Sequence, residues 1–88
     1  LAEYKRTATY TRDTVPAGLL KAHTLKAGTW GELVVLEGHV RYVLEAQGEV
    51  RGDALVVLSP KLAGVIAPEA LHRVEVPAGA RFFVRFLR

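Results

Sequence analysis

The chain has 88 residues, of which 50% are hydrophobic and 24% are charged, with no cysteine and no methionine. This length predicts one small domain over residues 1–88 and excludes kinases, Rossmann-type methyltransferases and two-domain enzymes. The net charge of +3 is not clustered, so we expect no nucleic-acid partner, and the lack of cysteine excludes disulfides and thiolate chemistry.

Short runs of alternating apolar and polar residues, separated by turns, predict an all-β domain. No stretch keeps the apolar period of a helix for three turns. We expect about eight strands, at residues 3–11, 19–25, 30–37, 39–45, 54–58, 63–67, 72–76 and 81–87. Glycine and proline mark the turns between them, including one at residues 46–48. The regular spacing of the turns predicts an antiparallel barrel or sandwich.

Side-chain alternation predicts which residues face the core. The run at 33–36 is apolar on both faces, which makes it the expected surface of a homodimer. In the strand at 72–76 the charged residues Arg73 and Glu75 share one face, and His72 therefore points inward. In the last strand, every second residue is apolar and inward, and the core row consists of Phe82, Val84 and Phe86.

Two segments resemble motifs of the cupins. Residues 64–75, with Pro68 and His72, resemble the second cupin motif, in which an inward histidine lines the barrel mouth. Residues 30–38 resemble the end of the first motif. With His23 and Lys26, these segments resemble the small cupin-like family found as the N-terminal domain of the tellurite-resistance protein TehB and as stand-alone YeaR-type proteins. The resemblance implies an all-β, cupin-like double-stranded β-helix, an antiparallel β-barrel of the jelly-roll type.

A typical metal-binding cupin supplies three histidines and a glutamate, and this pattern is depleted here. The positions expected for two histidines and the glutamate fall near Leu25 and Ala27 and at Gly31. His23 and His72 remain as metal ligands for a divalent transition metal such as zinc, nickel, copper or iron, with water completing the coordination. The alternative is that the two imidazoles are hydrogen-bonded within a polar pocket.

Other side chains are expected around the same pocket. Lys26 follows His23 by three residues, and Tyr42 shares the inward parity of its strand, so the two would join His23 and His72 around a small molecule or oxyanion. A rim position for Lys26 is the other interpretation. Trp30 is expected to seal the end of the barrel, with ligand stacking as the alternative.

Two further polar residues are weighed as ligands. His39 follows a turn glycine and should face solvent. Glu32 lies opposite in parity to its inward neighbours, which argues against its acting as a third metal ligand.

These features lead to three hypotheses about function. The first is a non-enzymatic protein that binds a small ligand, an oxyanion or a metal, in a response to tellurite or related stress as the resemblance implies. The second is a metal-dependent enzyme acting at the pocket of His23 and His72, and the third is a structural dimerisation module. The methyltransferase of the larger TehB-type proteins is a separate domain, for which this sequence lacks the glycine-rich turn.

The setting of the protein is also predicted. No apolar run approaches the roughly 20 residues that span a bilayer, and no signal peptide is visible, so we expect a cytoplasmic protein without a membrane partner. A small chain without disulfides is marginally stable alone, which favours a homodimer. The scarcity of heat-labile side chains indicates a thermophilic source.

Overall fold

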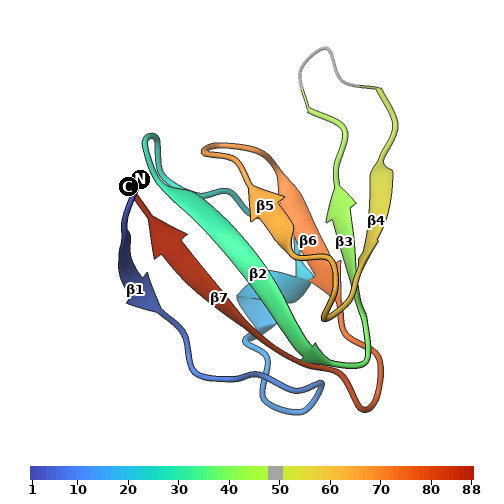
Figure 1. The fold of residues 1–88 in the computed structure, drawn as a ribbon. Coiled ribbons are helices and arrows are strands. Elements are labelled where there is room, and N and C mark those ends of the chain that lie inside the picture. The colour runs from blue at the N-terminus through green and yellow to red at the C-terminus, as the bar shows by residue number, and fades with distance from the viewer. Residues whose placement is uncertain (48–50) are drawn as a thin grey trace.

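The computed structural model describes residues 1–47 and 51–88. The described residues form strands and one short 3₁₀ turn, η1 (Figure 1). In chain order the elements are β1 (Glu3–Arg6), η1 (Ala17–Leu20), β2 (Trp30–Glu37), β3 (Val40–Leu44), β4 (Ala54–Leu58), β5 (Gly64–Ile66), β6 (His72–Glu75) and β7 (Arg81–Leu87).

The all-β prediction is confirmed, and three strands have the predicted bounds, namely β2, β4 and β7. The strand predicted at 19–25 is wrong. Residues Ala17–Leu20 form η1 instead, because the Leu19 amide donates to the Pro16 carbonyl at 3.0 Å and closes a local turn. The strand predicted at 3–11 ends early at Arg6, and beyond it Tyr10 forms only an isolated bridge to Phe82.

The strands form two antiparallel sheets, ordered β1-β7-β2-β5 and β4-β3-β6. The expected closed barrel is therefore not formed by the described strands. The chain crosses between the sheets at the turn from β4 to β5, which are edge strands of different sheets. Gly64 of β5 lies against Leu58 of β4, where an added Cβ would come within 2.5 Å of a Leu58 methyl carbon. Glycine thus allows the two edges to pack without a shared hydrogen-bond ladder.

The core lies between the inner faces of the two sheets. Alternate residues of β2 and β7 supply one wall, including Leu33, Val35 and Phe82, each at most 2% exposed. The strands β3, β4 and β6 supply the facing wall with Val40, Leu58 and further buried side chains. The prediction that β7 buries alternate residues is confirmed for its buried positions Phe82 and Val84.

The run at 33–36 places one of its two apolar faces in the domain's own core, and its use as a dimer surface stays a prediction. Leu33 and Val35 belong to the domain's own core, and Val34 is half-buried. Only Leu36 of this run is exposed, at 42%. The run is apolar on both faces because Leu33 and Val35 close the core on one face. On the other face, Val34 lies beside Phe83, its register partner in β7.

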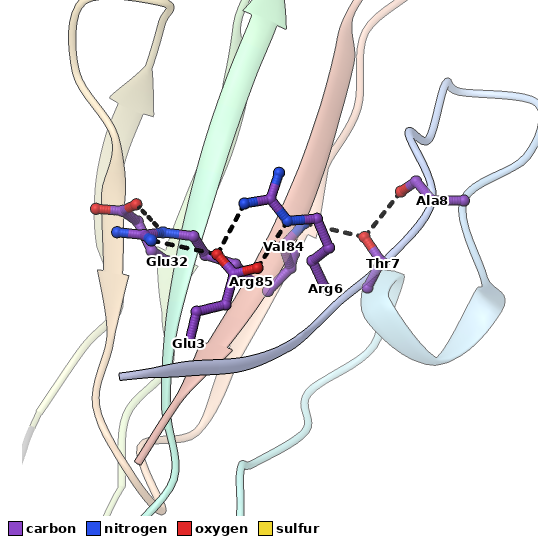
Figure 2. Close-up of polar contacts among 7 residues, drawn as sticks. All are labelled: Glu3, Arg6, Thr7, Ala8, Glu32, Val84 and Arg85. Carbon is purple, nitrogen blue, oxygen red and sulfur yellow. Dashed lines mark hydrogen bonds and ion pairs between the residues drawn. The ribbon is translucent and has the colours of Figure 1, made fainter. Parts of the chain in front are cut away.

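Ion pairs cross the outer face of the four-stranded sheet. Figure 2 shows Glu3 accepting hydrogen bonds from Arg6 at 2.8 Å and from Arg85 at 3.3 Å, while Arg85 also donates to Glu32 at 2.6 Å. Next to them, Thr7 Oγ1 accepts a hydrogen bond from the backbone amide of residue 84. These contacts hold the N-terminal segment across β7, beside which both chain ends lie (Figure 1).

One sequence prediction concerns the turn between β3 and β4. Of the turn expected at 46–48, Gly48 lies outside the described residues, whereas the Gln47 side chain forms hydrogen bonds with the backbone of Glu69 and Leu71.

The expectation that the chain has no membrane span rests on the shortness of its apolar runs. Within the part of the chain that the structure describes, no helix is long and apolar enough to cross a bilayer.

Candidate functional site: a histidine pair in an apolar cavity

A cavity of about 480 Å³ opens between the four-stranded sheet and the segment around η1. Most of the side chains around it are apolar, and only a few carry polar groups. We call it the histidine cavity, and its lining consists of Lys5, Thr7, Tyr10, Pro16, Gly18, Leu19, His23, Leu25, Leu33, Ile66, His72, Val74, Phe82, Val84 and Phe86. Its volume falls in the range of small-molecule sites, which are mostly apolar with a few placed polar groups.

The two histidines lie side by side in this cavity. His72 begins β6 and faces inward because the charged residues Arg73 and Glu75 occupy the other face of the strand. His23 pairs with it through a two-way backbone bridge of 2.9 and 3.0 Å. Their ring centroids are 4.0 Å apart with an interplanar angle of 60°. The chain thus brings together the two imidazoles that the sequence singled out, although His23 sits on an isolated bridge rather than on the predicted strand.

The backbone determines which nitrogen of each ring is available. Nδ1 of His23 lies 2.8 Å from the carbonyl oxygen of Lys21, and Nδ1 of His72 lies 2.8 Å from that of Ala70. A carbonyl oxygen only accepts, so each Nδ1 carries the proton and donates it. Each neutral ring therefore keeps its lone pair on Nε2, and no described residue forms a hydrogen bond with either Nε2. The pair offers two acceptor nitrogens to a ligand in the cavity.

The local turn that orients His72 is strained. Glu69 has a φ of 63°, a left-handed backbone conformation that residues other than glycine rarely adopt. This turn follows Pro68 and is held by the Glu69 amide, which donates to the Leu25 carbonyl at 3.0 Å. This turn fixes the position of the Ala70 carbonyl, and that carbonyl orients the His72 ring.

Burial keeps His72 neutral. The side chain is 1% exposed, and this desolvation lowers its pKa below the ordinary 6.5. The hydrogen bond to the Ala70 carbonyl opposes this effect, while the neighbouring charge of a protonated His23 would lower the pKa further. At neutral pH, His72 is therefore an uncharged hydrogen-bond acceptor.

Tyr42 lies behind His72 rather than in the cavity. Its ring stacks on that of His72 with centroids 5.6 Å apart and an interplanar angle of 28°. Its hydroxyl is buried and has no hydrogen-bond partner among the described residues, and burial raises the pKa of Tyr42. The shared parity that suggested a pocket position is correct for burial. It does not bring the hydroxyl to the cavity, because His72 lies between the two.

Lys26 lines a different cavity from the one that the histidine pair lines. It is exposed and lines a second cavity of about 370 Å³ together with other basic side chains. We call this the basic cavity, and its lining consists of Tyr4, Lys5, Thr24, Leu25, Lys26, Thr29, Phe86 and Arg88. The Lys26 side chain lies there because the turn from Lys26 to Thr29 reverses the chain before β2.

The remaining candidates lie outside the histidine cavity. Glu32 pairs with Arg85 on the outer face, as its parity predicted, and His39 is exposed. Trp30 is half-buried at the start of β2 and is absent from the lining of both cavities. In residues 1–47 and 51–88, no group of three or more histidine, cysteine, aspartate or glutamate side chains is placed to hold a metal ion.

The N-terminal part of the cavity wall was not predicted from the sequence. Lys5, Thr7 and Tyr10 line the histidine cavity, but β1 is exposed along its whole length and shows no alternation. One feature of the sequence could have indicated them. The inward residues predicted for β7 require a second neighbouring strand in addition to β2. Lys5 is the register partner of Phe86 in that strand.

Most of the chain matches a known protein family. A family model described as a TehB-like domain matches residues 5–84. The chain belongs to the TehB-like domain family. The predicted membership in the family of the TehB N-terminal domain is therefore confirmed.

Curated relatives carry this TehB-like domain within longer chains. The protein named "Probable S-adenosyl-L-methionine-dependent methyltransferase TehB" from Haemophilus influenzae (strain 10810) is 34% identical over 73 residues, covering 82% of this chain and 25% of that protein. The protein of the same name from a second Haemophilus influenzae strain gives the same identity and coverage. The chain thus spans about a quarter of the length of these relatives.

Solved structures show the same fold. The crystal structure of TehB from Haemophilus influenzae superposes with a TM-score of 0.86 at 29% identity, covering 97% of this chain and 30% of that one. A protein from E. coli (strain K12) superposes with a TM-score of 0.82 at 23% identity, covering 97% of this chain and 87% of that one. The second likeness concerns the fold alone.

Proposed function

We propose that this TehB-like domain binds a small, mostly apolar molecule in the histidine cavity. Nε2 of His23 and of His72 would accept hydrogen bonds from a hydroxyl or similar donor on that molecule. The observation that carries the proposal is the pair of 2.8 Å contacts from Nδ1 to backbone carbonyls, which leaves two acceptor nitrogens beside an apolar wall. Burial of the ligand's apolar surface supplies affinity, and the two nitrogens select the donor.

A free oxyanion receives less support at these two rings. An oxyanion such as tellurite accepts hydrogen bonds, whereas neutral imidazoles protonated on Nδ1 present only acceptors on Nε2. Lys26, which would have supplied a positive charge, lines the other cavity.

Metal binding by the same histidine pair is the second candidate function. Metal-bound histidines commonly donate their other ring nitrogen to a carbonyl, as both rings do here. Catalytic zinc sites, however, use three protein ligands, and the described residues bring only these two imidazoles together. The donor set therefore fits a weakly held ion completed by water better than a metal-dependent enzyme.

The fold supports a cupin-like interpretation in part. From β2 onward the chain passes from one sheet to the other and back twice before ending in β7, next to β2. We propose that this arrangement is an open form of the cupin double-stranded β-helix. Methyl transfer is the activity named for the curated relatives, and we do not assign it to a chain that spans about a quarter of their length.

A role as a dimerisation module needs an exposed apolar surface, and β4 offers one in addition to the run at 33–36. The edge strand β4 pairs on one side with β3, and its residues Leu55, Val56 and Val57 are 48%, 39% and 49% exposed. No charged residue or proline protects this edge within Ala54–Leu58. We propose that two copies pair through β4. Sedimentation should give twice the monomer mass for the wild type and the monomer mass for Val57→Lys, and a monomeric wild type would refute the dimer.

Titration with 4-propylphenol tests the proposed function, because this molecule combines an apolar body with one hydroxyl donor. Calorimetry should detect binding to the wild type. His23→Gln should weaken it by about threefold to tenfold, the value of one hydrogen bond. His39→Gln, which changes an exposed histidine outside the cavity, should bind as the wild type does. Equal affinity of all three proteins, or no binding, would contradict the proposal.

The metal alternative is tested with the same proteins. Zinc or nickel alone is titrated in place of the phenol. Binding of either metal to the wild type that is lost in His23→Gln and kept in His39→Gln supports metal binding by the pair, and no binding excludes it.

A further inference from the structure

The basic cavity gathers positive charge without a compensating acid. Three of its lining side chains, Lys5, Lys26 and Arg88, are cationic, and none of its lining residues is acidic. Lys5 and Lys26 form no ion pair within residues 1–47 and 51–88. The arginines at 6, 41, 73, 81 and 85 pair with carboxylates, whereas Lys21, Lys61 and Arg12 form no ion pair among the described residues either. Lys5 and Lys26 differ from these other cations in that both line one cavity. The two lysines are thus left available to a charge that comes from outside the chain.

The chain folds so that distant segments bring these cations together. Lys5 comes from β1, and Lys26 comes from the turn before β2, where Thr29 donates to the Lys26 carbonyl at 3.0 Å. The guanidinium of Arg88 lies 3.8 Å from the centre of the Tyr4 ring, which holds it against the cavity wall. Like charges lining one cavity repel one another, and an anion would relieve that repulsion.

The hydroxyl groups in the wall complete the set of donors. Thr24 and Thr29 line the same cavity as the three cations. Ammonium groups and hydroxyls together are the donors that bind a carboxylate or phosphate oxygen. The histidine cavity has the opposite chemistry, since its lining is mostly apolar and its two imidazoles accept.

The two cavities are neighbours. They share part of their lining, namely Lys5, Leu25 and Phe86. Leu25 and Phe86 thus extend the apolar surface of the histidine cavity into the basic cavity, and Lys5 borders both. A single elongated molecule would thus meet apolar surface along its body and positive charge at one end.

We propose that the basic cavity binds an anionic group carried by the same ligand whose apolar body occupies the histidine cavity. The ligand class is then an apolar or aromatic carboxylate with a hydroxyl donor at its far end. The hydroxyl contacts the histidine pair, and the carboxylate contacts Lys5 and Lys26. This inference rests on the proposed function, and it adds the charge and the length of the ligand.

Three probes separate the parts of this ligand. The compound 3-(4-hydroxyphenyl)propanoate carries body, hydroxyl and carboxylate, 4-propylphenol lacks the carboxylate, and acetate is the carboxylate without the body. Calorimetry on the full chain should show the propanoate binding at least about fivefold more tightly than 4-propylphenol, and acetate far more weakly than both. Lys26→Gln should remove the advantage of the propanoate, and Lys5→Gln should do the same. Lys61→Gln, a lysine outside both cavities, should keep it.

Each other outcome has a distinct meaning. Equal affinity for the propanoate and 4-propylphenol in the wild type overturns this inference and leaves the proposed function intact. Acetate binding as tightly as the propanoate also overturns it, because the basic cavity then takes a free anion. If neither phenol binds, the proposed function fails, and this inference fails with it.

Discussion

The two faces of the four-stranded sheet are made by alternate residues of the same strands, yet they treat polar groups in opposite ways. On the outer face, Glu3, Arg85 and Glu32 form a row of paired charges in partial contact with water. The inner face is mostly apolar, and His23 and His72 lie beside it in the wall of the histidine cavity. Figure 2 shows Glu3 in contact with both Arg6 and Arg85, and Arg85 also in contact with Glu32.

This difference between the two faces indicates that the inner face carries the functional groups. Exposed ion pairs stabilise little individually, and their role here is to keep β1 in place across β7. The two imidazoles differ from these pairs, because each keeps an Nε2 without a hydrogen-bond partner among the described residues, beside a mostly apolar wall. A ligand that donates to them supplies that partner.

The largest test of the comparison is to truncate neighbouring aromatic residues on opposite faces of β7. Phe82→Ala should lower the free energy of unfolding by about 3–5 kcal/mol, since Phe82 is fully buried and its removal leaves a cavity. Phe83→Ala should cost clearly less, because Phe83 is half-buried on the outer face beneath Arg6. Urea unfolding measures both, and similar losses would show that the two faces do not differ as described.

The next test uses the pH dependence of the inner face. Burial lowers the pKa of His72 below 6.5, so the unfolded chain binds this proton more tightly than the folded chain. The contribution of His72 to stability is therefore present above pH 6.5 and is lost as the pH falls below that value. Urea unfolding at about pH 8 and about pH 5.5 should show a smaller loss in His72→Gln than in the wild type. The exposed control His39→Gln should keep the wild-type loss, and an unchanged loss in His72→Gln would contradict the assignment.

The smallest effect is expected on the outer face. The hydrogen bond from Arg6, with that from Arg85, lowers the pKa of Glu3 to about 2. The contribution of Glu3 to stability is thus present above its ordinary value of 4.5 and is lost as the pH falls toward 2. NMR titration of the Glu3 carboxyl carbon should give this low midpoint in the wild type, and Arg6→Gln should raise it. A wild-type midpoint near 4.5 would mean that the pairs do not persist in solution.

The sequence predicted those parts of the fold that depend on alternation within one strand. The charged residues Arg73 and Glu75 forced His72 inward, and the arginines of β7 forced Phe82 inward. The segment at 19–25 has no such internal reference, because Leu19 and Leu20 fit a strand as well as a turn. Its local hydrogen bond to Pro16 decided the outcome, and such a bond cannot be seen in apolar periodicity.

The candidate site was predictable only where residues share a strand or a motif. The inward position of His72 followed from its strand, and that of His23 from its motif. The separation of Lys26 and Tyr42 did not, because it depends on how a turn and a neighbouring sheet pack in space. The basic cavity was out of reach for the same reason, since Lys5, Lys26 and Arg88 lie far apart in the sequence.

The central claim is that both imidazoles keep the proton on Nδ1 and offer Nε2 to the cavity, and long-range ¹H–¹⁵N NMR of the histidine side chains tests it most directly. At a pH above the histidine pKa values, His23 and His72 should both show a protonated Nδ1 and an unprotonated Nε2, since both Nδ1 atoms donate to carbonyls. Addition of 4-propylphenol should shift both Nε2 signals and leave His39 unchanged. A proton on Nε2 of either ring, or Nε2 signals that do not respond to the phenol, would contradict the account.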